Sequence, residues 1–306
     1  MVRPAAFDYN PQTAASNPLQ KRPDLEAGAL HRLALAQFDD CVRTLRRERI
    51  RVCVAHDTPQ PPKPDAVFPN NWVSFHSDGT VVLYPMHADS RRGERRREII
   101  DQAARELRFP VRRTLDLSHH ERAGRCLEGT GSLVLDRPNR IAYACRSPRT
   151  DAAVLEEWAR EMRYEAVPFA AEDELGRAIY HTNVMMCIGA RFALVAAQSI
   201  LPGDRGRVLE RLAAAGREII EVGRAAVAAF GANVLELESP MQTRGPASLR
   251  AGVLVMSSTA HRAIGPGVLA RLAECTGKVL VVSVPTIERI GGGGVRCMLA
   301  EVFCAS

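Results

Sequence analysis

Four consecutive glycines, Gly291–Gly294, constrain this chain more than any other feature. Glycine loses more backbone entropy on ordering than any other residue, so the run does not suit the interior of a helix or strand. It suits a loop whose backbone passes close to other groups and whose N–H groups can face an anion. Cys297 follows at the head of an apolar run. A thiolate beside such a loop is a candidate nucleophile, although a buried cysteine often serves only as a small hydrophobe.

The composition is that of an ordinary globular protein. The chain has 306 residues, 46% hydrophobic and 25% charged, which allows one or two domains. Its net charge of +6 is carried almost wholly by arginine. We expect the densest basic run, 91–97, to be a solvated helix face and not a nucleic-acid site, because no aromatic residues interleave it.

Other classes of protein and site are disfavoured. No segment has the roughly 18 apolar residues of a membrane span, and the N-terminus lacks a signal-peptide pattern. The eight cysteines include no C-x-x-C pair, and we expect His119 and His120 to be exposed in a polar loop, with no metal. The chain has neither G-x-G-x-x-G nor a P-loop. We expect a cytoplasmic, thiol-reduced protein with no cofactor, membrane or nucleic-acid partner.

A strand–turn–strand–helix–strand module recurs along the chain. We predict copies at 71–75, 80–84, 90–107 and 111–115; at 132–135, 141–144, 151–163 and 165–169; at 181–188, 191–196, 204–215 and 218–222; and, more loosely, at 234–238, 252–256, 259–275 and 279–284. A helix at 30–47 with strands at 50–54 and 295–303 could complete a fifth. Such repeats indicate a radial or solenoid α/β architecture, here one domain over residues 1–306 with its site at the central axis.

Three polar segments stand at the starts of successive hairpins. They are 68–72 with Asn71, 127–132 with Glu128, and 180–184 with His181 and Asn183. Together with Cys297 they offer a thiol, an imidazole, a carboxylate and amides, which is the set that cysteine catalysis on a carbonyl-like carbon needs. Taken singly, each segment is weak evidence, because a lone histidine before a strand is usually structural.

The order and spacing of the motifs resemble the guanidino-group-modifying, or pentein, superfamily: arginine deiminases, dimethylarginine dimethylaminohydrolases, agmatine deiminases and amidinotransferases. The resemblance covers nearly the whole chain and is strongest to a bacterial amidinotransferase-like branch that includes a citrulline-utilising hydrolase. The motifs that carry it are Val2-Arg3-Pro4, Asn17-Pro18-Leu19-Gln20, Phe68-Pro69-Asn70-Asn71-Trp72, Leu127-Glu128-Gly129-Thr130-Gly131, His181-Thr182-Asn183-Val184 and Gly291-Gly292-Gly293-Gly294-Val295-Arg296-Cys297.

The resemblance implies a five-bladed α/β propeller, in line with the module count. It also implies that Cys297 attacks the central carbon of a guanidino or ureido group. His181 would donate a proton to the leaving nitrogen and then activate water, and Glu128 would orient the group. The thiolate would need a neighbouring imidazolium or the substrate's own charge, because a free thiol is mostly protonated at neutral pH.

Two departures from the family bear on the substrate. Asn71 and Asn183 stand where arginine deiminases carry aspartate. A buried charge without its partner can cost roughly 3–5 kcal/mol, so the loss of two carboxylates disfavours a guanidinium. An amide both donates and accepts, which suits a neutral ureido group. We therefore expect a hydrolase that prefers citrulline and releases ornithine.

The rest of the substrate site is less specified. Candidates for binding an α-carboxylate are Arg3, Arg244 and Arg296, although Arg296 could instead form a salt bridge outside the site. We also place Phe68 and Asn17 at the substrate. Asn17 and Gln20 could equally well only close the ring.

Several alternative functions stay open. These are dimethylarginine dimethylaminohydrolase or arginine deiminase activity, amidino transfer to an amine, and a non-catalytic propeller that binds a partner. A homo-oligomer is also possible.

Overall fold

The computed structural model describes residues 1–238 and 252–303, where strands form four three-stranded sheets and one two-stranded pair. In each three-stranded sheet the middle strand pairs antiparallel with the first and parallel with the third. The four sheets are β3 (Val73–Phe75), β4 (Thr80–Leu83) and β5 (Arg113–Asp116); β6 (Val134–Asp136), β7 (Ile141–Cys145) and β8 (Glu165–Phe169); β9 (Met186–Ile188), β10 (Phe192–Val195) and β11 (Glu218–Glu221); and β12 (Leu235–Leu237), β13 (Val253–Ser257) and β14 (Lys278–Val282). Four of the predicted modules are therefore present.

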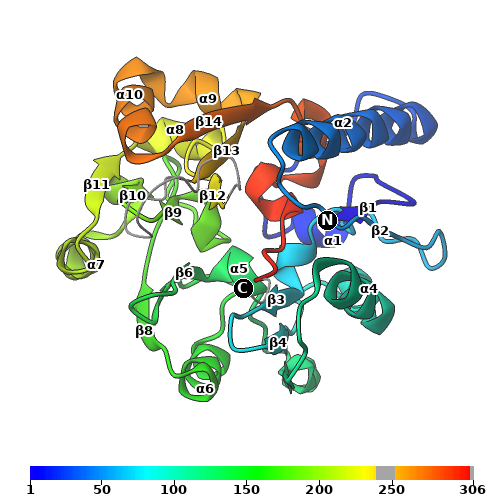
Figure 1. Ribbon diagram of the computed structural model, residues 1–306, viewed down its shortest axis with the longest axis horizontal. Helices are drawn as coiled ribbons and strands as arrows, with labels where there is room; N and C mark the ends of the chain where they lie inside the picture. The colour runs from blue at the N-terminus through cyan, green and yellow to red at the C-terminus, as the bar shows by residue number, and fades with distance from the viewer. Residues whose placement is uncertain (239–251, 304–306) are drawn as a thin grey trace.

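A helix connects the second and third strands of each sheet. These helices are α4 (Arg97–Leu107), α6 (Ala152–Met162), α7 (Pro202–Ala214) and α10 (Gly265–Cys275). Asp151 caps α6 by accepting from the backbone N–H groups of Ala153 and Val154. Figure 1 shows the helices on the outside and the first strands β3, β6, β9 and β12 toward the middle. The inner ends of the sheets therefore meet.

Two of the predicted long helices are broken. The helix expected at 90–107 is divided into α3 (Asp89–Arg92) and α4, and the one expected at 259–275 into α9 (Ser258–Ala263) and α10. The second break occurs at Gly265, whose φ of +75° is left-handed and ends a helix. The first occurs where two buried charges, Arg91 and Glu94, turn inward to pair with each other.

The predicted fifth module does not form a three-stranded sheet in the described residues. Its helix is present as α2 (Ala27–Arg47), but residues 50–54 are not a strand. Two-residue strands β1 (Val2–Arg3) and β2 (Ala55–His56) pair instead. Residues 295–303 were expected to be a strand, and they begin as the 3₁₀ turn η8 (Val295–Met298) with no strand after it. The fold is thus α/β with separate mixed sheets, none of which closes on itself.

Short helical turns take the place of the predicted strand starts. They are η1 (Pro69–Asn71) before β3, α5 (Gly129–Ser132) before β6 and η3 (Thr182–Val184) before β9, and all their residues are buried. The remaining short elements are α1 (Pro11–Ala14), η2 (Ser118–Ala123), η4 (Ala197–Ser199), α8 (Arg224–Ala228) and the π-helix η7 (Ile287–Gly291). The turns before the first strands hold the polar residues singled out in the sequence.

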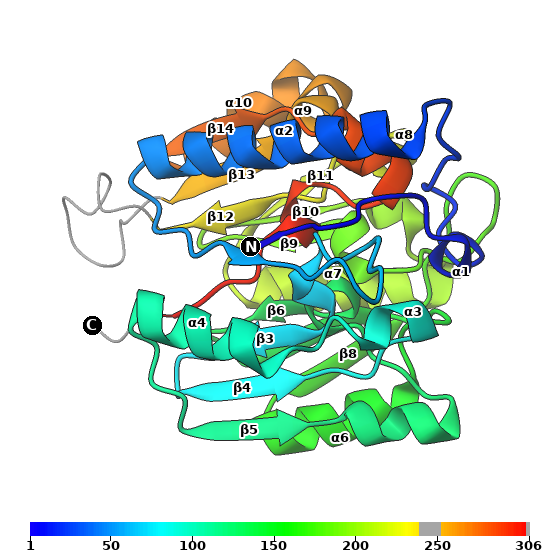
Figure 2. The same ribbon diagram turned by 90° about the vertical axis from the view of Figure 1, so that its right-hand side faces the viewer.

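Different segments of the chain lie at the two ends of the molecule. Figure 2 shows α1 and α3 at one end and the C-terminal segment at the opposite end.

No helix of the described residues has the length and apolar character needed to cross a membrane.

A chain of polar contacts runs through the core between the first two sheets. The indole Nε1–H of Trp158 donates to the Tyr84 hydroxyl at 3.0 Å, which lies 2.7 Å from Ser74 Oγ. Ser74 Oγ in turn lies 2.9 Å from His76 Nε2. All four residues are buried. Burial, aided by nearby arginines, lowers the pKa of His76 from 6.5 to about 3.

This buried histidine should make the protein lose stability in acid. Between pH 6.5 and about 3 the unfolded chain binds a proton at His76 that the folded chain does not, so the free energy of unfolding falls as the pH falls. His76→Gln should remove about 1.4 kcal/mol per pH unit of that slope. Urea denaturation of the wild type and the variant, at neutral pH and in mild acid, measures how the free energy of unfolding changes with pH. Equal losses of stability in the variant and the wild type would contradict the prediction.

Candidate active site

Glu128 and His181 form a buried pair at the starts of two neighbouring modules. Glu128 directly precedes α5, and His181 directly precedes η3. Glu128 Oε2 lies 2.8 Å from His181 Nε2. The other carboxylate oxygen, Oε1, accepts from the backbone N–H of His87 at 3.0 Å. The structure thus brings the predicted carboxylate and imidazole together, and their roles in a reaction stay predictions.

Two buried arginines that the sequence analysis did not place in the site surround Glu128. Arg149 Nη1 donates to Glu128 Oε2 at 3.3 Å, and Arg91 Nη1 lies 3.9 Å from the same oxygen. The expectation that 91–97 is wholly a solvated face was wrong for Arg91, which is 2% exposed. Its guanidinium pairs with Glu94 at 2.8 Å. A buried arginine needs such a partner, and the pairing turns the residue inward.

The charges around the pair fix its protonation state. Burial opposes ionisation of Glu128, but Arg149, the hydrogen bond with His181 and Arg91 together hold the pKa of Glu128 well below its usual range. Burial, aided by both arginines, lowers the pKa of His181 to about 4, although the ionised Glu128 acts in the opposite direction. At neutral pH a carboxylate therefore faces a neutral imidazole. Since a carboxylate only accepts, the ring proton is assigned to Nε2, which leaves Nδ1 free to take up a proton.

Asn71 joins the same cluster. Its Oδ1 accepts from Arg91 Nη1 at 2.8 Å, and its Nδ2 donates to Asn70 Oδ1 at 3.0 Å. A Cβ atom on Gly131 would lie 2.6 Å from Asn71 Nδ2 and 2.8 Å from His181 Nδ1. The absence of a side chain at Gly131 therefore lets the amide and the imidazole approach the same point.

The glycine-rich loop is held in place by residues distant in sequence. Gly292 has a φ of +66°, and its carbonyl accepts from Asn17 Nδ2 at 2.9 Å and from the Tyr180 hydroxyl at 2.5 Å. Gln20 Nε2 donates to the carbonyl of Ile290 at 3.1 Å. Asn17 and Gln20 thus bind the backbone of the loop, and a contact of Asn17 with the substrate stays a prediction.

Phe68 lies against the same loop. A Cβ on Gly291 would lie 2.7 Å from its ring, and one on Gly293 would lie 2.9 Å from it. The ring occupies the space that side chains would need, so glycine is required at both positions. Phe68 therefore shapes the loop that carries Cys297, and its contact with a substrate stays a prediction.

Cys297 lies within η8 and is buried. Its Sγ is 3.7 Å from Asn183 Nδ2 and 3.4 Å from Asn233 Nδ2. Asn183 follows His181 by two residues, so the same turn η3 links the thiol to the Glu128–His181 pair. Burial raises the pKa of the Cys297 thiol, although the hydrogen bond from Asn233 opposes this. The resting thiol is therefore protonated at neutral pH.

Arg296 points away from this cluster. Its Nη1 donates to the carbonyl of Leu299 at 2.9 Å, and its Nη2 lies 3.4 Å from Glu301 Oε2. Arg137 pairs with the same carboxylate, also at 3.4 Å. The structure therefore does not bring Arg296 to Glu128 and His181, and its binding of substrate stays a prediction. Adjacent residues of the chain point to different sides, and the salt bridge considered as its alternative is present.

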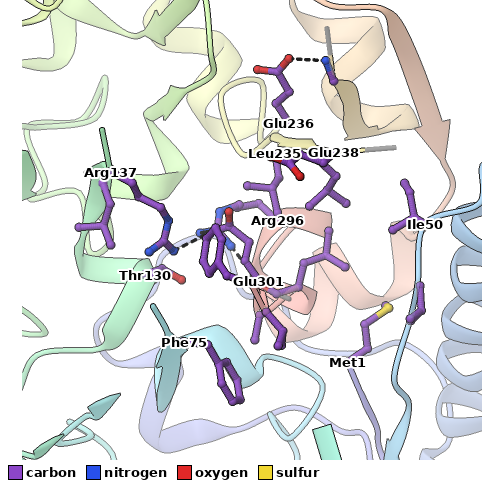
Figure 3. A pocket seen from close by; sticks show the side chains of 18 of the residues that line it. Met1, Ile50, Phe75, Thr130, Arg137, Leu235, Glu236, Glu238, Arg296 and Glu301 are labelled. Atoms are coloured by element: carbon purple, nitrogen blue, oxygen red, sulfur yellow. Dashed lines mark hydrogen bonds and ion pairs between the residues drawn. The ribbon is translucent and has the colours of Figure 1, made fainter. Parts of the chain in front are cut away.

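A cavity lies on the side of Arg296. It has a volume of about 880 Å³, and Figure 3 shows Arg296, Glu301 and Arg137 meeting in it. Thr130 lines this cavity, whereas Cys297, His181 and Glu128 do not. This cavity is therefore not the site expected for those three at the central axis. All three are at most 3% exposed, so a substrate reaches them only if the residues that cover them move.

Of the remaining candidates for binding a carboxylate, Arg3 is engaged elsewhere. Arg3 forms a salt bridge with Asp39 at 2.8 Å, and both side chains are partly exposed. Arg244 lies outside the described residues.

One group of three metal-ligating side chains occurs within the part of the chain that the structure describes. Ligand atoms of His119, His120 and Glu157 lie within 4.8 Å of one another. His119 is exposed and His120 half-buried. The hydrogen bond between His120 Nε2 and Glu157 Oε2 at 2.9 Å accounts for their close approach.

The chain resembles known proteins in sequence and in fold. A family described as N,N dimethylarginine dimethylhydrolase, eukaryotic, matches residues 3–304. Among solved structures, ArgZ, an arginine dihydrolase from the ornithine–ammonia cycle in cyanobacteria, has 18% identity and a TM-score of 0.72. The alignment covers 100% of this chain but 40% of ArgZ, whereas it covers 97% of an ArgZ N-terminal domain solved separately. No curated protein matches in sequence.

Two further structures have the same fold. Unliganded AgrE has 19% identity and a TM-score of 0.71, over 97% of this chain and 38% of AgrE. A dimethylarginine dimethylaminohydrolase adduct with S-methyl-L-thiocitrulline has 18% identity and a TM-score of 0.62, over 96% of each chain. Because the family match covers nearly the whole sequence, the chain belongs to the N,N-dimethylarginine dimethylhydrolase family of the guanidino-group-modifying, or pentein, superfamily.

Proposed function

We propose that this protein is a cysteine-dependent hydrolase of arginine-related compounds that cleaves the ureido group of citrulline and releases ornithine. One observation carries the choice of substrate. The carboxylate of Glu128 already interacts with Arg149 and His181, and positions 71 and 183 carry amides. A cationic guanidinium beside Glu128 would find that carboxylate already paired and amides at the two other positions, whereas a neutral ureido group needs only hydrogen-bond partners.

The protonation states set the order of the proton transfers. The thiol of Cys297 and the imidazole of His181 are both neutral at rest, so the proton of the thiol passes to His181 as Sγ attacks the ureido carbon. His181 gives this proton to the departing nitrogen of ornithine, and the cysteine is left as an S-carbamoyl thioester. Water, activated by His181, attacks that carbon. The thiol is restored, and the carbamate released decomposes to ammonia and carbon dioxide.

The amino-acid end of the substrate needs partners for an ammonium and a carboxylate group. Asp65 is 1% exposed, and its Oδ1 has no hydrogen-bond partner among the described residues. Its Oδ2 lies 3.9 Å from Arg91 Nε. We propose that Asp65 receives the ammonium group and that Arg91 and Arg149 attract the carboxylate, in place of the three arginines considered from the sequence.

A second candidate function is the hydrolysis of arginine in two steps, first to citrulline and then to ornithine. The fold is similar to that of ArgZ, which is described as an arginine dihydrolase. The same thiol and imidazole would serve both steps, because each step releases a nitrogen from a tetrahedral centre bonded to sulfur.

An assay panel tests both functions. The purified protein is incubated with citrulline, arginine, dimethylarginine or agmatine, and ornithine, citrulline and ammonia are measured. We expect ornithine from citrulline at a higher kcat/KM than from arginine. Ornithine from arginine at an equal or higher kcat/KM would favour the two-step function. Citrulline from dimethylarginine, with no ornithine from any substrate, would contradict both. Adding an amine acceptor shows whether the enzyme also transfers the group.

Asn71→Asp should shift the preference toward the cationic substrate. A carboxylate at this position cannot donate to Asn70, and it attracts a guanidinium. We expect the ratio of kcat/KM for citrulline to that for arginine to fall about tenfold. The gain for arginine should be smaller than the loss for citrulline, because Arg91 lies at hydrogen-bond distance and neutralises part of the new charge. An unchanged ratio would show that Asn71 does not sense the charge of the substrate.

The arrangement of the modules supports a wider proposal about the fold. We propose that residues 1–306 form a single catalytic domain of the pentein type with five sectors. Four sectors would be the three-stranded sheets. The fifth would be α2 with the pair β1–β2.

A further inference from the structure

Asn233 touches the sulfur of Cys297, although no sequence motif pointed to it. Its Nδ2 lies 3.4 Å from Sγ, closer than Asn183 Nδ2 at 3.7 Å. Asn233 is 1% exposed and comes from the loop between α8 and β12, a different module from that of Asn183. Two amides from separate modules therefore flank the thiol.

Neighbouring acceptors fix the orientation of both amides. Asn233 Nδ2 donates to the backbone carbonyl of Asn183 at 2.9 Å, and a carbonyl cannot donate, so nitrogen and not oxygen faces this side. By the same reasoning Asn183 Nδ2 is fixed by the carbonyl of Thr130 at 3.0 Å. Asn183 Oδ1 accepts from Asn233 at 3.2 Å. Both amide nitrogens are thus held within 3.7 Å of the sulfur, and both Oδ1 atoms lie 3.8 Å from it, where they can accept from the resting thiol.

The backbone around Asn233 is shaped to hold it there. Phe230 has a φ of +60°, a left-handed conformation that bulky residues rarely adopt, and its carbonyl accepts from the Asn233 N–H at 2.9 Å. Gly294, in the loop of Cys297, leaves room for the amide, because a Cβ there would lie 2.5 Å from Asn233 Oδ1. Such backbone strain persists only where the surrounding structure enforces it, and it is concentrated at functional sites.

A neutral substrate leaves the thiolate without help from substrate charge. A guanidinium would stabilise the developing sulfur anion, but a ureido group has no charge, and His181 is neutral at rest. The other charged or titratable groups near Cys297 are Arg296, which is engaged with Glu301, Arg91, which is engaged with Glu94, and Tyr180. A direct hydrogen-bond donor to sulfur is therefore needed from the protein.

We propose that Asn233 is a catalytic residue that donates a hydrogen bond to the thiolate of Cys297 as it forms. The reason for this role rests on the proposed function, because a neutral substrate creates the need. The contact with sulfur does not depend on that function, so it can be tested without substrate. A hydrogen bond to an anion is stronger than one to a neutral group, and its loss should therefore show as a smaller thiolate fraction.

The rate of alkylation of Cys297 by iodoacetamide reports the thiolate. In a Cys304→Ser background, cleavage after Arg296 yields the peptide 297–306 with one thiol, which mass spectrometry quantifies. Asn233→Asp keeps the size of the side chain, removes the donor and adds a negative charge; both changes disfavour the thiolate, and Gly294→Ala, which adds no charge, separates them. We expect alkylation to be roughly tenfold slower at neutral pH. The curve of alkylation rate against pH should also shift to higher pH. Asn139→Asp, in an exposed hairpin turn, is the matched control and should leave the profile unchanged.

Gly294→Ala supplies a second test in case Asn233→Asp does not fold. Its methyl group would displace Asn233 from sulfur and should produce the same alkaline displacement with Asn233 still present. Turnover of citrulline by either variant should recover at high pH, whereas misplacement of Cys297 would lower the rate equally at every pH.

The outcomes separate the two proposals. A wild-type alkylation profile in Asn233→Asp, or a loss that does not depend on pH, would overturn the role of Asn233 even if citrulline is hydrolysed. A displaced profile in a protein that does not hydrolyse citrulline would support the contact with thiolate and reject only the proposed substrate.

Discussion

Cys297→Ser should reduce the formation of ornithine from citrulline by a factor on the order of 10⁴ or more. The nucleophile in the proposed mechanism is a thiolate, and a serine hydroxyl ionises at far higher pH. A hydroxyl is a far weaker acid than a thiol, so it passes its proton to His181 far less readily as it attacks the unreactive ureido carbon. The fold should be unaffected, since Asn183 and Asn233 can donate to an oxygen as they do to sulfur.

Two measurements decide this prediction. Ornithine is quantified over hours with citrulline in excess, and thermal unfolding compares the variant with the wild type. Cys275→Ser is a matched control, because that thiol is buried at the periphery beside Glu218 and should be dispensable. Activity of Cys297→Ser within tenfold of the wild type would remove Cys297 from the mechanism.

The modules could be predicted because their information is local. Strand β8 at Glu165–Phe169 has the predicted bounds, since it lies between a capped helix and a turn whose signals are adjacent in sequence. The prediction of the fifth module failed because its conformation depends on residues that are distant in the sequence. Residues 295–303 include an apolar run that suits a strand, but their conformation is set by contacts from distant segments, including those of Gly294 with Asn233 and of Arg137 with Glu301.

The site could be predicted only where motifs mark it. Glu128 and His181 lie in motifs with recognisable spacing, and they are hydrogen-bonded. Arg149 and Asn233 have no such signal, because each reaches the site through the packing of its module and not through its neighbours in sequence. The identity of Arg91 was visible, but its burial depends on the pairing with Glu94, which breaks the predicted helix.

The fifth module and the missed site residues have one cause in common. In both, charged or polar groups bind partners that are distant in the sequence. A hydrophobic pattern has a local period, and it locates the inner face of an element from that element alone. A buried polar group needs a specific partner, and in this protein that partner usually lies in another module. This is why the strands and most helices could be predicted from the sequence, while the electrostatics of the site required the structure.

His181→Gln should lower turnover of citrulline by about 10²–10⁴, the usual effect of losing an acid–base group. Glutamine can keep a hydrogen bond to Glu128, but it can neither accept the thiol proton nor activate water. Any S-carbamoyl enzyme that forms should persist, and it should be visible in acid-quenched samples as an addition of about 43 Da on the peptide 297–306. Glu128→Gln is the companion variant, because it keeps the imidazole but removes its ionised partner.

The dependence on pH distinguishes this role from a structural one. The wild type needs neutral His181, whose pKa is about 4, so kcat should stay level as the pH falls toward 5 and decline only below that. Protonation removes the base, so the acid limb reflects loss of the neutral form. In Glu128→Gln the imidazole loses the anion that favours its charged form, so the acid limb should move to still lower pH. If kcat of the wild type instead declined near pH 6.5, as for an exposed histidine, another group would carry the proton. The same would follow if kcat of His181→Gln declined at the same pH as that of the wild type.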